Sequence, residues 1–197
     1  GGILLPNIAP DVKWVKPLYD RCYDPLWQVL QDLEVPINIH SGSGNPDYGP
    51  YPVSMLLYIN EVPFYTERPL VQLILSGVFE RFPRLKVVLT EAGCAWVPPL
   101  LERLDTNIRS IRDTGATGEI RYGADHILPK DATEYFHQNV WMGVSQPRQA
   151  DADARHIIGL DKFMWGSDYP HDEGTYPYTR ANLRARFSDA PEAEMRK

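Results

Sequence analysis

The chain has 197 residues, of which 43% are hydrophobic and 23% charged, and its formal net charge is −6. This composition is ordinary for one globular domain with a sizeable core. The absence of a lysine and arginine cluster argues against nucleic acid as a partner, and no apolar run approaches the roughly 18 residues of a membrane span. Cys22 and Cys94 are the only cysteines, so we expect a reduced, cytoplasmic location.

Strand-like and helix-like segments alternate about five times along the chain. We expect strands at 3–8, 35–40, 85–91, 140–144 and 163–167, helices at 25–33, 68–81, 96–112, 132–137 and 151–158, and loops at 41–52 and 113–130. Pro69 suits the first turn of its helix, and Pro83 ends that helix. The alternation predicts a parallel sheet with right-handed crossovers in a single domain, 1–197.

Five such units cannot close an eight-stranded barrel, and an open set of strands would expose two sheet edges. If the strands belong to a barrel, about three further units, on the order of 100 residues, would precede them. The chain also begins inside an apolar run and ends within a helix-like pattern at 193–197. We therefore expect it to be part of a longer protein.

Three of the expected strands end in a side chain that can bind a metal ion. His40, Glu91 and Asp168 occupy these positions, and parallel strands collect their C-terminal ends on one face. Imidazole and carboxylate are normal ligands of Zn²⁺ or Mn²⁺. The alternatives are structural: His40 caps a turn, Glu91 pairs with an arginine such as Arg103, and Asp168 accepts hydrogen bonds from the amides at 169–171.

Other side chains near these strand ends have weaker signals. His171 either supports Asp168 and donates a proton, or is an exposed loop histidine. Aromatic residues near the expected mouth would suit a ring-bearing substrate or serve only packing; Tyr48, Trp96 and Tyr169 are the substrate-binding candidates, with Tyr51 and Tyr176 nearby. A lone cysteine beside glycine, such as Cys94, is more often a small buried hydrophobe than a thiolate. The remaining histidines are not expected to be ligands; they are His126, His137 and His156.

Three stretches resemble one family. They are 35–42, the GVFERFPRLKVV segment at 77–88, and 164–171, which contains WGSDYPH. Together they are similar to the amidohydrolase-2 branch of the amidohydrolase superfamily, which includes the aminocarboxymuconate-semialdehyde decarboxylase-like enzymes. The resemblance implies an α/β fold, a distorted TIM (β/α)₈ barrel of which this chain supplies about the last five units, with a divalent metal, Zn²⁺ or else Mn²⁺.

The resemblance also assigns roles to individual residues. His40 matches the metal ligand on the fifth barrel strand, and Asp168 matches the aspartate on the eighth. Glu91 stands where the family often has a histidine on the sixth strand, which predicts altered chemistry. The family's first-strand ligands have no counterpart in this sequence.

We expect a metal-dependent hydrolase that acts on a small cyclic or aromatic substrate through a metal-activated water. Asp168 would take the proton, and Glu91 or His171 would assist. The alternatives are a non-oxidative decarboxylase of the same family and a non-catalytic barrel fragment. A homo-oligomer is compatible with the open edges. A nucleotide site is disfavoured, since we find no glycine-rich phosphate loop between a strand and a helix.

Overall fold

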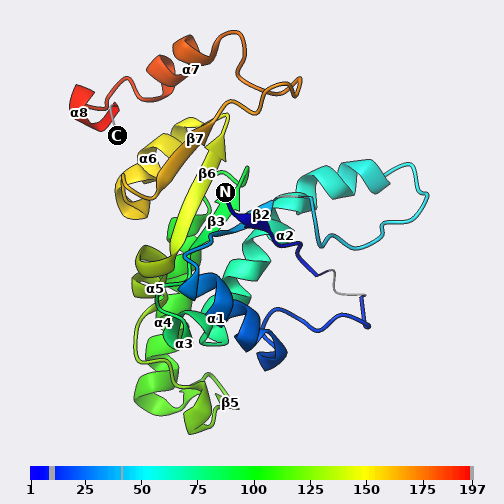
Figure 1. Ribbon diagram of the computed structural model, residues 1–197, viewed down its shortest axis with the longest axis vertical. Coiled ribbons are helices and arrows are strands. Elements are labelled where there is room, and N and C mark those ends of the chain that lie inside the picture. Colours follow the sequence, from blue (N-terminus) through cyan, green and yellow to red (C-terminus); the bar gives the residue numbers. More distant parts are fainter. Residues whose placement is uncertain (9–11, 41, 196–197) are drawn as a thin grey trace.

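A computed structural model describes residues 1–8, 12–40 and 42–195. At its centre lies a five-stranded sheet in the order β1-β2-β3-β6-β7, in which every neighbouring pair is parallel. The strands are β1 (Ile3–Leu4), β2 (Ile37–His40), β3 (Val87–Thr90), β6 (Val140–Ser145) and β7 (Phe163–Gly166). Parallel strands in chain order with helices between them are the arrangement found in (β/α)₈ barrels. The predicted fold class is confirmed (Figure 1).

Helices connect the strands and cover the sheet. They are η1 (Arg21–Tyr23), α1 (Asp24–Asp32), α2 (Ser54–Leu75), α3 (Val78–Arg81), α4 (Val97–Thr114), η2 (Ala124–His126), α5 (Ala132–Asn139), α6 (Gln149–Ile158), α7 (Thr179–Arg186) and α8 (Glu192–Met195). Figure 1 shows α7 and α8, in orange and red, on the β7 side of the sheet. None of the helices in the described ranges is both long and apolar enough to cross a membrane.

Alternation along the strands explains which face of the sheet carries the core. In β2, Ile37 and Ile39 are fully buried, whereas Asn38 and His40 are only partly buried. The buried side chains join helical residues such as Trp27 and Leu70 in one apolar cluster. Because successive side chains point to opposite faces, the other face is left for polar residues at the strand ends.

The register of the sheet aligns those strand ends. Ile37 pairs with Val87, and His40 pairs with Thr90, the last residue of β3. Glu91 therefore follows directly beside the end of β2. This alignment places the polar residues at the C-terminal ends of neighbouring strands along the same edge of the sheet.

The helix expected at 68–81 begins much earlier, at Ser54, so the expected place of Pro69 in a first turn is wrong. Pro69 lies inside α2 and has no N–H to donate to the Tyr65 carbonyl one turn earlier. The side-chain amide of Asn7 donates to that carbonyl instead, at 3.0 Å. A distant residue thus satisfies the group that the proline leaves unpaired. The helical region still ends at Arg81, near the expected boundary.

Several elements differ in smaller ways from the expected ones. The excursion at 113–130 is not all loop: it contains an antiparallel hairpin of β4 (Ala116–Thr117) and β5 (Ile120–Arg121). The first strand ends at Leu4 rather than residue 8, and α7 was not expected because it buries none of its residues. The start of the expected 41–52 loop, at Ser41, and the last two residues of the 193–197 helix lie outside the described residues.

Candidate active site

Two of the expected site residues are held in an unusual backbone conformation. Glu91 follows β3 with φ 56°, and Asp168 follows β7 with φ 58°. For residues other than glycine this left-handed conformation costs on the order of 1 kcal/mol or more. Such strain is found most often where a side chain must be aimed in one direction. Here the aimed side chains are two carboxylates.

These carboxylates belong to a cluster of four residues at the strand ends. Glu91, Asp168, His171 and Glu173 each offer one ligand atom, and the four atoms lie within 4.8 Å of one another. The three carboxylate oxygens form a donor set that fits a divalent cation and suits Mn²⁺ at least as well as Zn²⁺, and the imidazole of His171 lies beside them. Sequence reasoning missed Glu173, for which the only signal was an acidic residue two positions after His171.

Glu91 also contacts the expected ligand His40. The Nε2 atom of His40 lies 2.8 Å from Oε2 of Glu91, and their side chains are 44% and 23% exposed. The pairing follows from the register of β2 and β3. Glu91 thus pairs with His40 rather than with Arg103, whose charge acts instead on Glu67. His40 joins the site through Glu91 and is not one of the four clustered residues.

Asp168 contacts His171 across the turn that follows β7. Its Oδ2 atom lies 3.1 Å from Nδ1 of His171, and its carbonyl accepts the His171 N–H at 2.9 Å. This hydrogen bond, and then the negative charge of Asp168, raise the pKa of His171 above its usual 6.5. The Asp168 carboxylate therefore pairs with the imidazole rather than with the backbone amides of the turn.

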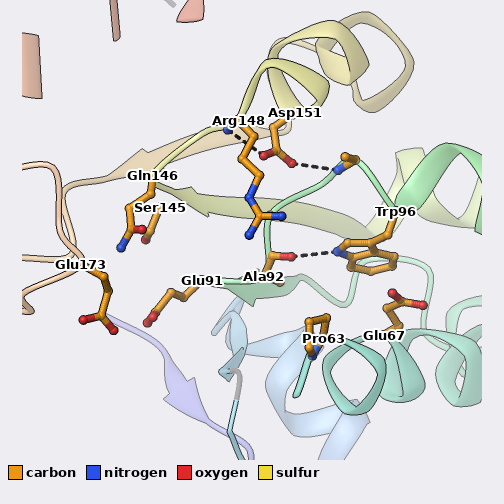
Figure 2. Close-up of a pocket in the computed structure, with 12 residues that line it drawn as sticks. Pro63, Glu67, Glu91, Ala92, Trp96, Ser145, Gln146, Arg148, Asp151 and Glu173 are labelled. Atoms are coloured by element: carbon orange, nitrogen blue, oxygen red, sulfur yellow. Dashed lines mark hydrogen bonds between the residues drawn. The ribbon is translucent and has the colours of Figure 1, made fainter. Parts of the chain in front are cut away.

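A cavity of about 450 Å³ opens beside the cluster. Figure 2 shows Glu91 and Glu173 on one side of it, Trp96 and Glu67 on the other, and the Arg148 side chain reaching in between. The indole N–H of Trp96 donates to the Ala92 carbonyl at 2.8 Å, which fixes the ring at the wall. Further lining residues are Pro63, Ala92, Gly93, Ala95, Ser145, Gln146 and Asp151.

The three expected substrate-binding aromatics do not share this cavity. Trp96 lines it, whereas Tyr48 and Tyr169 do not. The Tyr48 hydroxyl donates to Glu61 at 2.7 Å, and loss of hydration followed by this bond raises the pKa of Tyr48 to about 12. Tyr169 is exposed and packs edge-to-face on Tyr176, with ring centroids 5.2 Å apart.

Asp151, a buried carboxylate that we did not expect from the sequence, lines the cavity and connects two of its loops. Oδ1 of Asp151 accepts the N–H groups of Cys94 and Ala95 at 2.7 and 2.9 Å, and Oδ2 accepts the Arg148 N–H at 2.9 Å. Asp151 thereby ties the loop after β3 to the loop after β6. Burial, and then the charge of Asp151, raise the pKa of the Cys94 thiol, so this cysteine is a buried thiol and not a thiolate.

The fold and the cluster define a class: a parallel α/β barrel protein whose strands carry, at their C-terminal ends, side chains that could bind a metal ion. Comparison with known proteins narrows this class. The family model described as "Amidohydrolase" matches residues 2–197, so the chain belongs to this family. The predicted resemblance is confirmed.

The relatives of this chain include decarboxylases. The chain is 28% identical over 178 residues to gamma-resorcylate decarboxylase of Polaromonas sp. (strain JS666), covering 87% of this chain and 52% of that protein. It also matches the structure of 5-carboxyvanillate decarboxylase LigW from Sphingomonas paucimobilis at 26% identity, with a TM-score of 0.70 and coverage of 98% of this chain and 54% of that one. The chain spans about half the length of the curated relatives it matches.

A third comparison concerns a bound metal. The 5-carboxyvanillate decarboxylase of Novosphingobium aromaticivorans was crystallised with manganese and a nitrobenzoic acid. It shares 22% identity and a TM-score of 0.68 with this chain, over 97% of this chain and 51% of that one. At this identity the likeness establishes the fold alone.

Proposed function

We propose that the chain serves in a divalent-metal-dependent, non-oxidative decarboxylase of small aromatic carboxylic acids. One observation carries the proposal: the cluster of Glu91, Asp168, His171 and Glu173 lies beside a cavity walled by Trp96. The decarboxylases among the relatives support this reaction over hydrolysis, the reaction we first expected from the sequence.

Each residue of the site has a separate proposed role. Asp168, Glu91 and Glu173 would hold the cation, for which we prefer manganese to zinc, and His40 would orient Glu91 through its 2.8 Å contact. When bound, such a cation draws electrons from the oxygen atoms of the substrate. The Trp96 ring would position the aromatic ring of the substrate between it and the cluster.

Proton delivery falls to His171. Its hydrogen bond to Asp168 holds the imidazole beside the cluster, where the ring can carry and donate a proton. In the proposed step this proton is transferred to the ring carbon that bears the carboxylate. The bond between that carbon and the carboxylate then breaks, its electron pair returns to the ring, and CO₂ leaves. Water adds to no product atom, which separates this reaction from hydrolysis.

Isotope labelling tests the proposal. The Mn²⁺-loaded protein is incubated in H₂¹⁸O with 2,6-dihydroxybenzoate or 5-carboxyvanillate carrying ¹³C in the carboxylate. We expect ¹³CO₂ and a phenol without ¹⁸O, and we expect the rate to fall at least a hundredfold in His171→Gln. The matched control is His126→Gln, because His126 is also an exposed histidine paired with a neighbouring aspartate, but it lies outside the cluster. No release of ¹³CO₂ from either acid by the Mn²⁺-loaded protein would contradict the decarboxylase proposal.

A further inference from the structure

Arg148 presents a positive charge inside the cavity. It is the residue before α6, and the hydrogen bond from its N–H to Asp151 fixes its backbone at the cavity rim. Figure 2 shows its guanidinium group reaching into the space between Glu91 and Trp96. The group is exposed to the solvent that fills the cavity.

Within the described ranges, this guanidinium group has no hydrogen-bond or ion-pair partner, although three glutamates line the same cavity. The buried Arg155, by contrast, pairs with Asp189 and Glu194, both at 3.1 Å. A guanidinium carries five N–H donors in a planar fork that matches a carboxylate. The donors of Arg148 are thus available to a ligand.

The rest of the cavity suits a flat ring. The Trp96 ring is fixed by its bond to Ala92, and Pro63 adds a second apolar surface. A volume of about 450 Å³ is within the range of small-molecule sites and leaves room for a substituted benzene ring. The acidic cluster lies to one side of the cavity. A benzene ring in the cavity could therefore contact Arg148 through one substituent and face the cluster with another.

We infer that Arg148 holds a second carboxylate of the substrate, one that is not lost, and so selects aromatic dicarboxylic acids. This inference rests on the proposed function, in which the reacting carboxylate faces the cluster. The second carboxylate is present before, during and after loss of CO₂. Arg148 should therefore strengthen binding of substrate, transition state and product alike, which lowers KM and leaves kcat unchanged.

Calorimetry with two simple acids tests the subsite. Isophthalate and benzoate are titrated into the Mn²⁺-loaded wild-type chain and Mn²⁺-loaded Arg148→Gln, so that one carboxylate of each acid can face the cluster. We expect Arg148→Gln to weaken isophthalate about tenfold, in line with a charge-assisted bond partly screened by water, and to change benzoate less than twofold. Arg148→Lys should recover only part of the loss, because lysine cannot make the planar fork.

The matched control is Arg184→Gln, which removes the same charge from an exposed arginine of α7 outside the cavity lining. It should bind both acids as the wild type does. An equal loss for both acids in Arg148→Gln, no loss for either, or no binding of isophthalate to the wild type would overturn the inference.

The outcome is separable from that of the proposed function. If no CO₂ is released but isophthalate binding depends on Arg148, the subsite stands and the decarboxylase proposal fails. If a dicarboxylate is decarboxylated with the same KM by the wild type and Arg148→Gln, the proposed function stands and the subsite fails.

Discussion

Replacing Asp151 tests how the cavity is built. Its carboxylate accepts three backbone N–H groups from two loops and is only 5% exposed. In Asp151→Asn the remaining oxygen can still accept the N–H groups of Cys94 and Ala95. The new amide would then face the Arg148 N–H, so that two donors oppose each other. Asp151→Ala removes all three acceptors.

The expected cost follows from these bonds. A hydrogen bond to a charged group contributes about 1.5–3 kcal/mol, and each buried donor left unpaired costs about 1–3 kcal/mol. We expect Asp151→Asn to lower the free energy of unfolding by about 2 kcal/mol and Asp151→Ala by about 4 kcal/mol. For a chain of this size, 2 kcal/mol corresponds to a fall in Tm of about 4–8 °C.

Urea unfolding followed by circular dichroism measures these differences. The matched control is Asp153→Asn, because Asp153 lies on the same helix, is exposed and, among the described residues, pairs only with the Gln149 side chain. It should stay within about 0.5 kcal/mol of the wild type. If Asp151→Asn is no less stable than Asp153→Asn, Asp151 does not brace the two loops.

Three further predictions concern single groups. In chelator-treated protein the NMR titration midpoint of His171 should lie above 6.5 and fall in Asp168→Asn. Because folding raises this pKa, the pair stabilises the fold below pH 6.5, and this stabilisation is lost as the pH rises through the folded-state pKa. A wild-type midpoint at or below 6.5 would contradict the pairing. Asn7→Ala should cost about 1–2 kcal/mol in urea unfolding, since it leaves a helical carbonyl without a donor, and an unchanged stability would refute that role. Thiol titration with Ellman's reagent should modify exposed Cys22 in the folded chain and buried Cys94 only after unfolding; equal rates would contradict the burial of Cys94.

The sequence predicted the strands and their polar ends because both are local signals. A short apolar run that closes on His40, Glu91 or Asp168 needs no knowledge of distant residues to be recognised. Chain order then implied a parallel sheet, and a parallel sheet gathers its C-terminal ends. The partner of Glu91 could not be predicted in this way, because it depends on the register that pairs His40 with Thr90.

What the sequence could not predict depends on contacts that only the folded chain makes. The early start of α2 contradicts the local signal of Pro69, and it is possible because Asn7, far away in the chain, supplies the missing donor. Glu173 reaches the cluster through a turn closed by the hydrogen bond from the Thr175 N–H to the Ser167 carbonyl, at 3.1 Å. Sequence spacing indicates neither contact.

Manganese binding tests the central claim most directly, namely that the strand-end cluster is a metal centre. The measurement is an EPR titration of Mn²⁺ into the chain, which detects free ions, for the wild type, Asp168→Ala, Glu91→Ala and the control Asp153→Asn. We predict about one bound ion in the wild type and the control, and at least tenfold weaker binding in the two cluster variants. Binding that is equal in all four proteins, or absent from the wild type, would contradict the claim.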